Sequence, residues 1–139
     1  MIIESEDKKS YISIDFVEDE LERLPSICVS VSVKNNDFCG RNDMVWVELD
    51  VLKGFICELE RLDMNRKGIA TLGSMSPEDL ILTIEAYDLA GHLMLKYKLS
   101  KTMYCPDLLY SSTKGGFELD TSSFSNLIKE FNVFLQKYL

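Results

Sequence analysis

The stretch from Val45 to Leu72, VWVELDVLKGFICELERLDMNRKGIATL, decides the fold that this sequence encodes. Its first residues alternate apolar and polar, as a strand does, and its middle changes to apolar spacings of three and four, as in an amphipathic helix. The apolar stripe of that helix comprises Leu49, Leu52, Ile56, Leu59 and Leu62. Asp50 stands where an N-cap is expected, and residues 65–68 suit a left-handed helix end. The stretch therefore predicts a strand, a helix that covers a sheet, and a second strand.

Residues upstream of this stretch predict three strands. Tyr11 to Val17 alternates over a short run, and a charged link then leads to Pro25. The strongest alternation in the chain follows, with apolar residues at every second position from Ile27 to Val33. The sequence KNND at residues 34–37 supplies turn chemistry, because Asn and Asp tolerate left-handed conformations. The chain is expected to return as another strand with a bulge at Gly40.

A hairpin is predicted downstream, between Leu80 and Leu99, where both halves alternate. A two-residue turn at Ala90 and Gly91 would close it. That register places Glu85 directly across from Lys96 on the outer face, and it keeps the apolar residues of both halves on the other face. Both faces are thus satisfied by one register.

The C-terminal part of the chain predicts a second amphipathic helix. Residues 104–114 show no clean period and are interpreted as a long connection, and residues 115–120 as a short last strand. Ser122 or Ser123 is expected to cap the helix that follows. The apolar stripe of this helix comprises Phe124, Leu127, Ile128, Phe131, Leu135 and Tyr138.

Together these elements predict an α+β fold. We expect a mainly antiparallel sheet of about six or seven strands with the two amphipathic helices packed on one face. The strand-helix-strand unit leaves room for one parallel pair. At 139 residues, 15.9 kDa and a mean hydropathy of -0.02, the chain is expected to be a single domain over residues 1–139.

Charge and hydropathy restrict the partners. The chain has 23 Asp+Glu against 15 Lys+Arg and a net charge of -8, which argues against nucleic acid and favours a basic protein partner. No stretch approaches the roughly 20 apolar residues of a membrane span, and the apolar opening is too short for a secretory signal. We therefore expect a cytoplasmic protein with no membrane partner. The oligomeric state is left open.

The cysteines predict no metal site. Cys28, Cys39, Cys57 and Cys105 lie far apart, with no closely spaced pair and only His92 to assist them. We expect them to be small buried hydrophobic residues.

Nor does the sequence predict an enzyme or a cofactor. His92 is the only histidine and is expected at an exposed turn, and no nucleophile elbow or phosphate-binding glycine loop is present. Adjacent acids such as Glu118 with Asp120, or Glu78 with Asp79, leave one hydrolytic interpretation open, in which an acid pair holds a metal. Adjacent acids are common in any acidic protein.

The order of patterns along the chain resembles one family. The strand SICVSVSV, the F-x-G at residues 38–40, the segment VWVELDVLKGFICELERL, GIATLGSM and the hairpin LILTIEAYDLAGHLMLKYKL are similar to the WapI family of bacterial immunity proteins. The resemblance covers about residues 27–99 and, in general style, residues 117–139. It implies a small cytoplasmic protein that neutralises the toxic C-terminal domain of a wall-associated, contact-dependent toxin.

The resemblance implies that the protein acts by steric and electrostatic occlusion of a basic toxin, for example a nuclease. It supplies no contact residue, so the candidates are acids outside the expected core stripe. These partner-binding candidates are Glu18, Asp19, Glu20, Glu22, Glu58 and Glu60. A solvated surface that repels like charges explains the same acids without any partner.

An alternative function belongs to another class of protein. A small-ligand-binding or regulatory module would use a pocket between helix and sheet, with Trp46, Tyr87 and Tyr97 as its walls.

Overall fold

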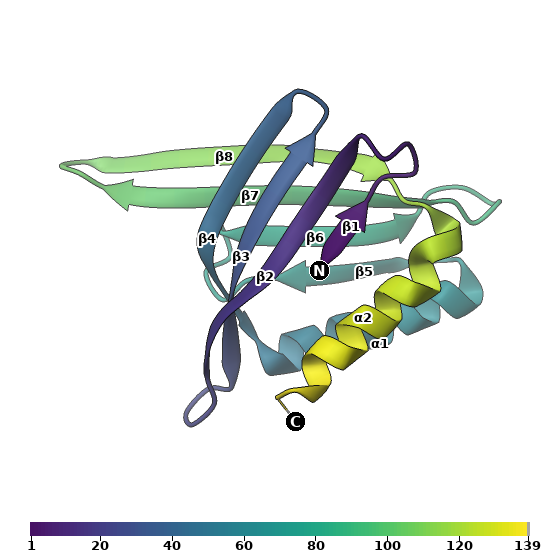
Figure 1. Cartoon of the computed structure of the whole chain (residues 1–139), viewed down its shortest axis with the longest axis horizontal. Helices are drawn as coiled ribbons and strands as arrows, with labels where there is room; N and C mark the ends of the chain where they lie inside the picture. Colours follow the sequence, from purple (N-terminus) through teal and green to yellow (C-terminus); the bar gives the residue numbers. More distant parts are fainter. Residues whose placement is uncertain (139) are drawn as a thin grey trace.

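The computed structural model describes residues 1–138, which form two four-stranded antiparallel sheets and two α-helices (Figure 1). The first sheet consists, in order, of β1 (Ile2–Glu4), β2 (Ser10–Glu20), β3 (Ser26–Asn35) and β4 (Phe38–Glu48). The second consists, in order, of β5 (Ile69–Gly73), β6 (Leu80–Ala86), β7 (Leu93–Tyr104) and β8 (Leu108–Glu118). Helix α1 (Leu49–Asn65) connects the sheets, and a 3-10 turn (Thr121–Ser123) leads into α2 (Phe124–Gln136).

The α+β class is confirmed, and the single sheet of six or seven strands is wrong. The chain divides eight strands between two sheets, because β4 runs directly into α1 and the helix carries the chain over to the start of the second sheet. Every strand pair is antiparallel, so the strand-helix-strand unit makes no parallel pair. The strands of the two sheets cross steeply in Figure 1.

One hydrophobic core lies between the sheets and the helices. The five predicted stripe positions of α1 are all buried, as is Phe55, whose ring meets that of Phe131 on α2 edge to face at 5.4 Å. The predicted stripe of α2 is also buried, except that Tyr138 is only partly covered. Both helices therefore cover the core, as their spacing indicates.

The start of α1 differs from the prediction. Glu48 occupies the N-cap position, without a side-chain cap, and Asp50 lies in the first turn. The amide of Leu49 instead donates to the carbonyl of Pro25 at 2.9 Å. The end agrees with the prediction, because Arg66 adopts φ 52° directly after the helix.

Gly40 is not the site of the bulge. It pairs regularly with Val33, and the irregular register lies between Asn42 and Val45, where β4 holds one extra residue. A Cβ atom at Gly40 would lie 2.6 Å from Cγ2 of Thr113 on β8. The glycine is therefore needed for the close approach of the two sheets.

The bulge brings Asn42 into contact with the second sheet. Its buried side chain donates from Nδ2 to the carbonyl of Ser100 at 2.7 Å and accepts at Oδ1 from the amide of Met44 at 3.0 Å. Beside it, Nζ of Lys101 lies 2.8 Å from Oδ1 of Asp43. These contacts join β4 to β7 at the bulge.

The predicted register of the β6–β7 hairpin is wrong by two residues. Ala86 pairs with Leu93, and the connection runs from Tyr87 to His92 rather than through a two-residue turn. Asp88 holds this longer connection in place, because its Oδ1 accepts hydrogen bonds from the backbone amides of Ala90 and His92, both at 3.0 Å. A side chain that satisfies two loop amides stabilises a longer connection.

The predicted connection over residues 104–114 is also wrong, because β8 begins at Leu108 and pairs with β7 as far out as Tyr104. The ends of these two strands project beyond the first sheet as a two-stranded hairpin, seen at the left of Figure 1. We call residues 101–112 the arm. Its central residues are exposed on both faces, so they lack the alternation of a half-buried strand. The short last strand expected at residues 115–120 is the inner end of β8.

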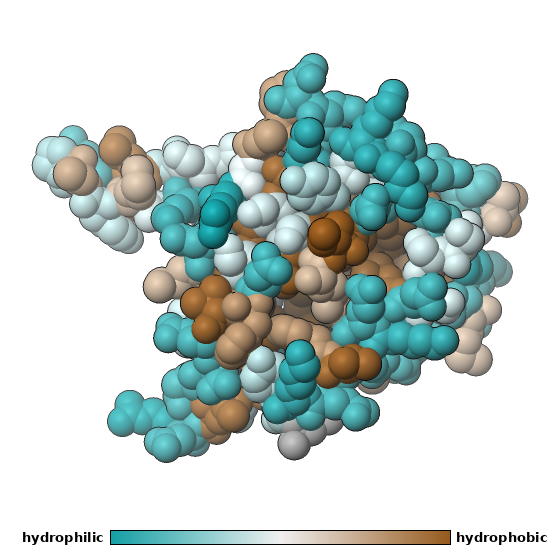
Figure 2. Space-filling model, in the orientation of Figure 1, coloured by the Kyte–Doolittle hydropathy of each residue, from teal (hydrophilic) through white to brown (hydrophobic). Residues whose placement is uncertain are grey.

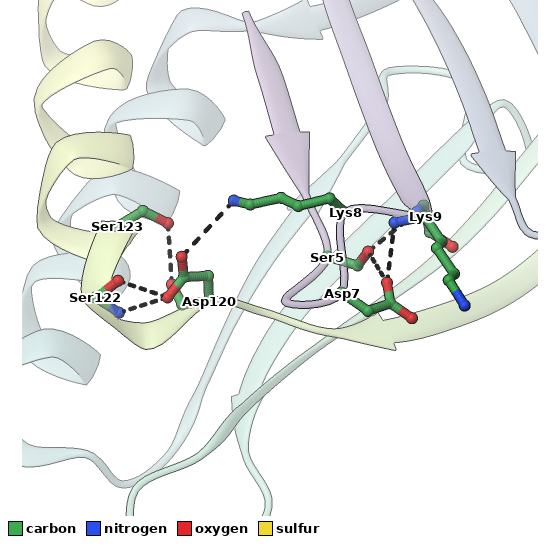
Figure 3. Close-up of polar contacts among 8 residues, drawn as sticks. Ser5, Asp7, Lys8, Lys9, Asp120, Ser122 and Ser123 are labelled. Atoms are coloured by element: carbon green, nitrogen blue, oxygen red, sulfur yellow. Dashed lines mark hydrogen bonds and ion pairs between the residues drawn. The ribbon is translucent and has the colours of Figure 1, made fainter.

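Polar contacts join the β1–β2 connection to the start of α2 (Figure 3). The carboxylate of Asp120 lies 3.7 Å from Nζ of Lys8 and accepts the amide of Ser122 at 3.0 Å. Ser123 occupies the N-cap position of α2, but its side chain makes no cap bond. Asp120, rather than either predicted serine, therefore caps the turn that opens this helix.

The cysteines are less buried than expected. Only Cys28, on β3, is buried, whereas Cys39, Cys57 and Cys105 are exposed. Cys39 lies on β4, Cys57 on the outer side of α1 and Cys105 at the tip of the arm. These positions face solvent, so the expectation of burial is wrong for them.

Candidate partner-binding surface

Four of the six predicted acids come together at the tip of the β2–β3 hairpin. Glu18, Asp19 and Glu20 end strand β2, and Glu22 lies in the turn after it. All four are exposed, and Oε1 of Glu20 accepts the amide of Glu22 at 2.9 Å. Arg23 is the only base among them. We call residues 17–25 the acidic tip.

A bulge in β2 shapes the acidic tip. The register shifts between Phe16 and Glu18, which leaves Val17 as the extra residue and re-aims the strand. The charged link predicted at residues 17–25 is therefore partly strand. Val17, Leu21 and Leu24 are exposed apolar side chains among the acids. In Figure 2 hydrophilic side chains dominate this tip, at the lower left, with hydrophobic ones beside them.

The charges of the acidic tip act on nearby groups. Burial, and then the negative charge of Glu18, raises the pKa of the Cys28 thiol. Burial, and then the charge of Asp19, raises the pKa of Tyr138. The negative potential of the tip thus extends to the strand and the helix end behind it.

The two helix acids lie apart from one another. Oε1 of Glu58 is 3.4 Å from the amide of Thr71 on the edge strand β5. Oε1 of Glu60 accepts instead from Nδ2 of Asn132 on α2 at 3.3 Å. Residues two apart on a helix point in different directions, so α1 carries these acids on two sides rather than as one patch. The six predicted residues therefore do not form one continuous surface.

In the acid pairs that left a hydrolytic interpretation open, three of the four carboxylates have other contacts. Glu78 accepts from Lys98 at 3.2 Å and from the hydroxyl of Tyr110 at 3.1 Å, contacts that lower its pKa. Burial raises the pKa of its neighbour Asp79.

The carboxylates of Glu118 and Asp120 bind different groups of the protein. Glu118 accepts the hydroxyl of Tyr87 at 2.8 Å, and this bond raises the pKa of that phenol to about 12. Asp120 caps the turn before α2, as described above. Within residues 1–138 no group of three or more His, Cys, Asp or Glu side chains is placed to hold a metal ion.

His92 is the last residue of the β6–β7 connection and is exposed, as predicted. Its Nδ1 lies 2.6 Å from Oδ2 of Asp88, and this contact raises the pKa of the imidazole.

The three residues predicted to line the alternative ligand pocket lie apart from one another. Trp46 lies on β4, Tyr97 is buried in the core from β7, and Tyr87 is an exposed residue of the β6–β7 connection. They belong to different parts of the fold and do not line one site between helix and sheet.

The arm, which carries exposed apolar and aromatic residues on two strands, is not predicted by the alternation of the sequence. In Figure 2 it projects at the upper left with brown and pale side chains. The usable signal is the Pro-Asp turn flanked on both sides by apolar and aromatic residues, in MYCPDLLY. Exposed apolar side chains of this kind mark interaction surfaces.

Comparison with known proteins identifies the family. Neither α1 nor α2, the two α-helices of residues 1–138, is long and apolar enough to cross a membrane. No curated protein and no solved structure matches the chain significantly. The family model described as the immunity protein WapI-like family matches residues 1–139. Because this match covers the whole length of the sequence, the chain belongs to the immunity protein WapI-like family.

Proposed function

We propose that this protein binds the toxic domain of a cognate toxin and neutralises it by occlusion. The observation that carries the proposal is the acidic tip, a projecting, exposed cluster of acids in a member of an immunity family. A hairpin that projects can enter a concave site and block it. The family accounts for a toxin as partner in general, and the acidic tip argues for its charge.

The partner favoured by this surface is basic. An acidic chain attracts a cationic protein over several ångströms of solution and raises the rate of encounter. A nuclease fits this description, because its substrate-binding groove has to attract phosphate. The exposed apolar residues Val17, Leu21 and Leu24 would supply the short-range contacts that charge alone does not give.

Occlusion requires no chemistry of the immunity protein itself, and we infer that the chain is not an enzyme. Three of the four acids considered as catalysts, Glu78, Glu118 and Asp120, are engaged in ion pairs, caps or hydrogen bonds with neighbouring groups.

The experiment uses the toxin domain encoded beside this gene and measures association by surface plasmon resonance and protection in cells. The test variant replaces Glu18, Asp19, Glu20 and Glu22 with Lys. The control variant carries the same number of reversals at exposed acids elsewhere, namely Glu4, Asp37, Asp50 and Glu130. A second test variant carries Glu58→Lys and Glu60→Lys.

We expect the acidic-tip variant to associate with the toxin about tenfold or more slowly than the wild type and to lose protection. The difference in association rate between the two proteins should shrink at high salt, because salt screens the charges. The control should retain most of both, although its net charge is the same. Equal behaviour of test and control variants would mean that the tip is a solvated surface and not the binding site. Loss of binding in the helix variant alone would move the site to α1.

A further inference from the structure

The outer face of the second sheet contains a groove. Its volume is about 530 Å³, and it lies over strands β6, β7 and β8. The side chains and backbone around it include Ile81, Met94, Lys96, Lys98, Lys114 and Gly116. Lys96 lies in the middle of this lining, because it pairs with Thr83 on β6 and with Gly116 on β8. A concave apolar site with a few charged groups is the usual form of a binding site.

Gly116 keeps the groove open. It pairs with Lys96 in the β7–β8 ladder and contributes no side chain to the outer face. A Cβ atom here would lie 2.6 Å from the carbonyl oxygen of Leu95. Side chains of β8 therefore border the hollow without filling it.

The arm continues this outer face beyond the groove. Lys98 pairs with Lys114 and Tyr104 with Leu108, so these four side chains share one face of the β7–β8 ladder. Tyr110 lies on the same face and donates its hydroxyl hydrogen bond to groups of the outer surface. Tyr104 is 82% exposed and Leu108 is 61% exposed. Exposed apolar and aromatic side chains of the arm thus adjoin the groove on one face of the sheet.

Ion pairs and hydrogen bonds engage several of the charges on this face, and Glu118 among them accepts the hydroxyl of Tyr87. Lys96 pairs with Glu85, diagonally in the observed register, and Lys98 pairs with Glu78 at 3.2 Å. Among residues 1–138 no ion pair is formed by Lys114, at the root of the arm, or by Asp107, at its tip. These opposite charges stand at the two ends of the arm.

We propose that a second copy of this chain covers the outer face of the second sheet. With two arms packed antiparallel about a two-fold axis, the tip of each arm reaches the near edge of the other copy's groove, where Ile81 pairs with Lys98 and Lys98 with Lys114. The same axis brings Asp107 of each copy toward Lys114 of the other, twice. A two-fold interface requires one patch that complements itself, and a groove beside an arm on one face meets that requirement.

Charge favours a second copy over a basic toxin at this face. The three lysines that line the groove offset the acids around them, so two chains of net charge -8 can approach here with less repulsion than elsewhere. A cationic partner is attracted instead to the acidic tip, which lies on the first sheet. Dimerisation goes beyond the proposed neutralising function and leaves the acidic tip available for the toxin.

The test is sedimentation equilibrium of the purified full chain without toxin, over a range of micromolar concentrations. We expect a mass twice that of the 15.9 kDa chain, with dissociation on dilution. Leu108→Glu in the arm and Ile81→Glu in the groove should each weaken the dimer about tenfold or more, because each buries a charge in the apolar contact. Leu89→Glu is the matched control, because Leu89 is fully exposed in the β6–β7 connection. Circular dichroism checks that every variant is folded.

Three outcomes would overturn the proposal that a second copy covers this face. They are a monomeric wild type throughout the range, a dimer that Leu108→Glu leaves intact, and a dimer that Leu89→Glu weakens as much. Toxin binding, measured with the same variants, separates the two proposals. A monomer in which Leu108→Glu abolishes toxin binding would assign the arm to the toxin interface.

Discussion

At the scale of single residues, glycines set how closely the strands approach. A Cβ atom at Gly115 would meet Nδ2 of Asn35 and the hydroxyl of Tyr97, both at 2.8 Å, where β8 passes the end of the first sheet. Asn35 uses this proximity, because its Nδ2 donates to the carbonyl of Gly116 at 3.2 Å. The sheets can therefore cross here only because β8 has no side chain at this point.

Gly116 and Gly54 form a matched pair for a mutational test. Gly116→Ala should lower the free energy of unfolding by about 1–3 kcal/mol, because the new methyl group meets a backbone carbonyl that cannot rotate away. Gly54→Ala should raise it by about 0.5–1 kcal/mol, because Gly54 lies in α1 with nothing within 4 Å of an added Cβ. Urea denaturation measures both. Equal effects of the two substitutions would contradict the close approach at Gly116.

At the scale of elements, the β6–β7 connection depends on one carboxylate. Asp88 accepts two loop amides and contacts the imidazole of His92, and these bonds lower its own pKa. Asp88→Asn should lower the pKa of His92 toward its ordinary value of about 6.5, because the hydrogen bond and charge that favour the imidazolium are lost. Titration followed by NMR reports this directly, since the chain has a single histidine.

The control for that titration is Glu6→Gln, because Glu6 contributes least to the shift of the His92 pKa. A His92 pKa that Asp88→Asn leaves unchanged would show that the contact is absent in solution.

Elements that bury one face could be predicted from sequence, and those that do not could not. The stripes of α1 and α2 predicted both helices because each packs a single side against the core. The arm escaped prediction because neither of its faces is buried, so its strands carry no alternation. The β6–β7 register was misjudged because alternation is unchanged by a shift of two residues, and side-chain bonds from Asp88 decided between the alternatives.

At the scale of the whole molecule, both sheets and both helices share one core, which predicts a single cooperative unfolding transition. Trp46 is the only tryptophan and reports on the first sheet, whereas far-ultraviolet circular dichroism reports on all elements. The two probes should give the same midpoint in urea. Separate midpoints would mean that the sheets unfold as two units and that residues 1–139 are not one domain.

The arrangement of the sheets and of the candidate site is a property of the whole fold. Alternation shows that a strand has a buried face but not which sheet it joins, so the sequence could not separate one sheet from two. Four acids gathered at the acidic tip because they are neighbours in sequence. Glu58 and Glu60 could not be placed beside them, because their surroundings depend on where β5 and α2 pack.

The strand orders have a consequence for the history of the chain as it is made. In both sheets every strand pairs with its neighbour in sequence, so the first four can zip together before the second sheet has been synthesised. The bridge between Ser5 and Leu119 is different, because it joins residues near opposite ends of the chain. It can form only when translation is nearly complete, so this direct backbone link between the two ends of the strand sequence is a late event in folding.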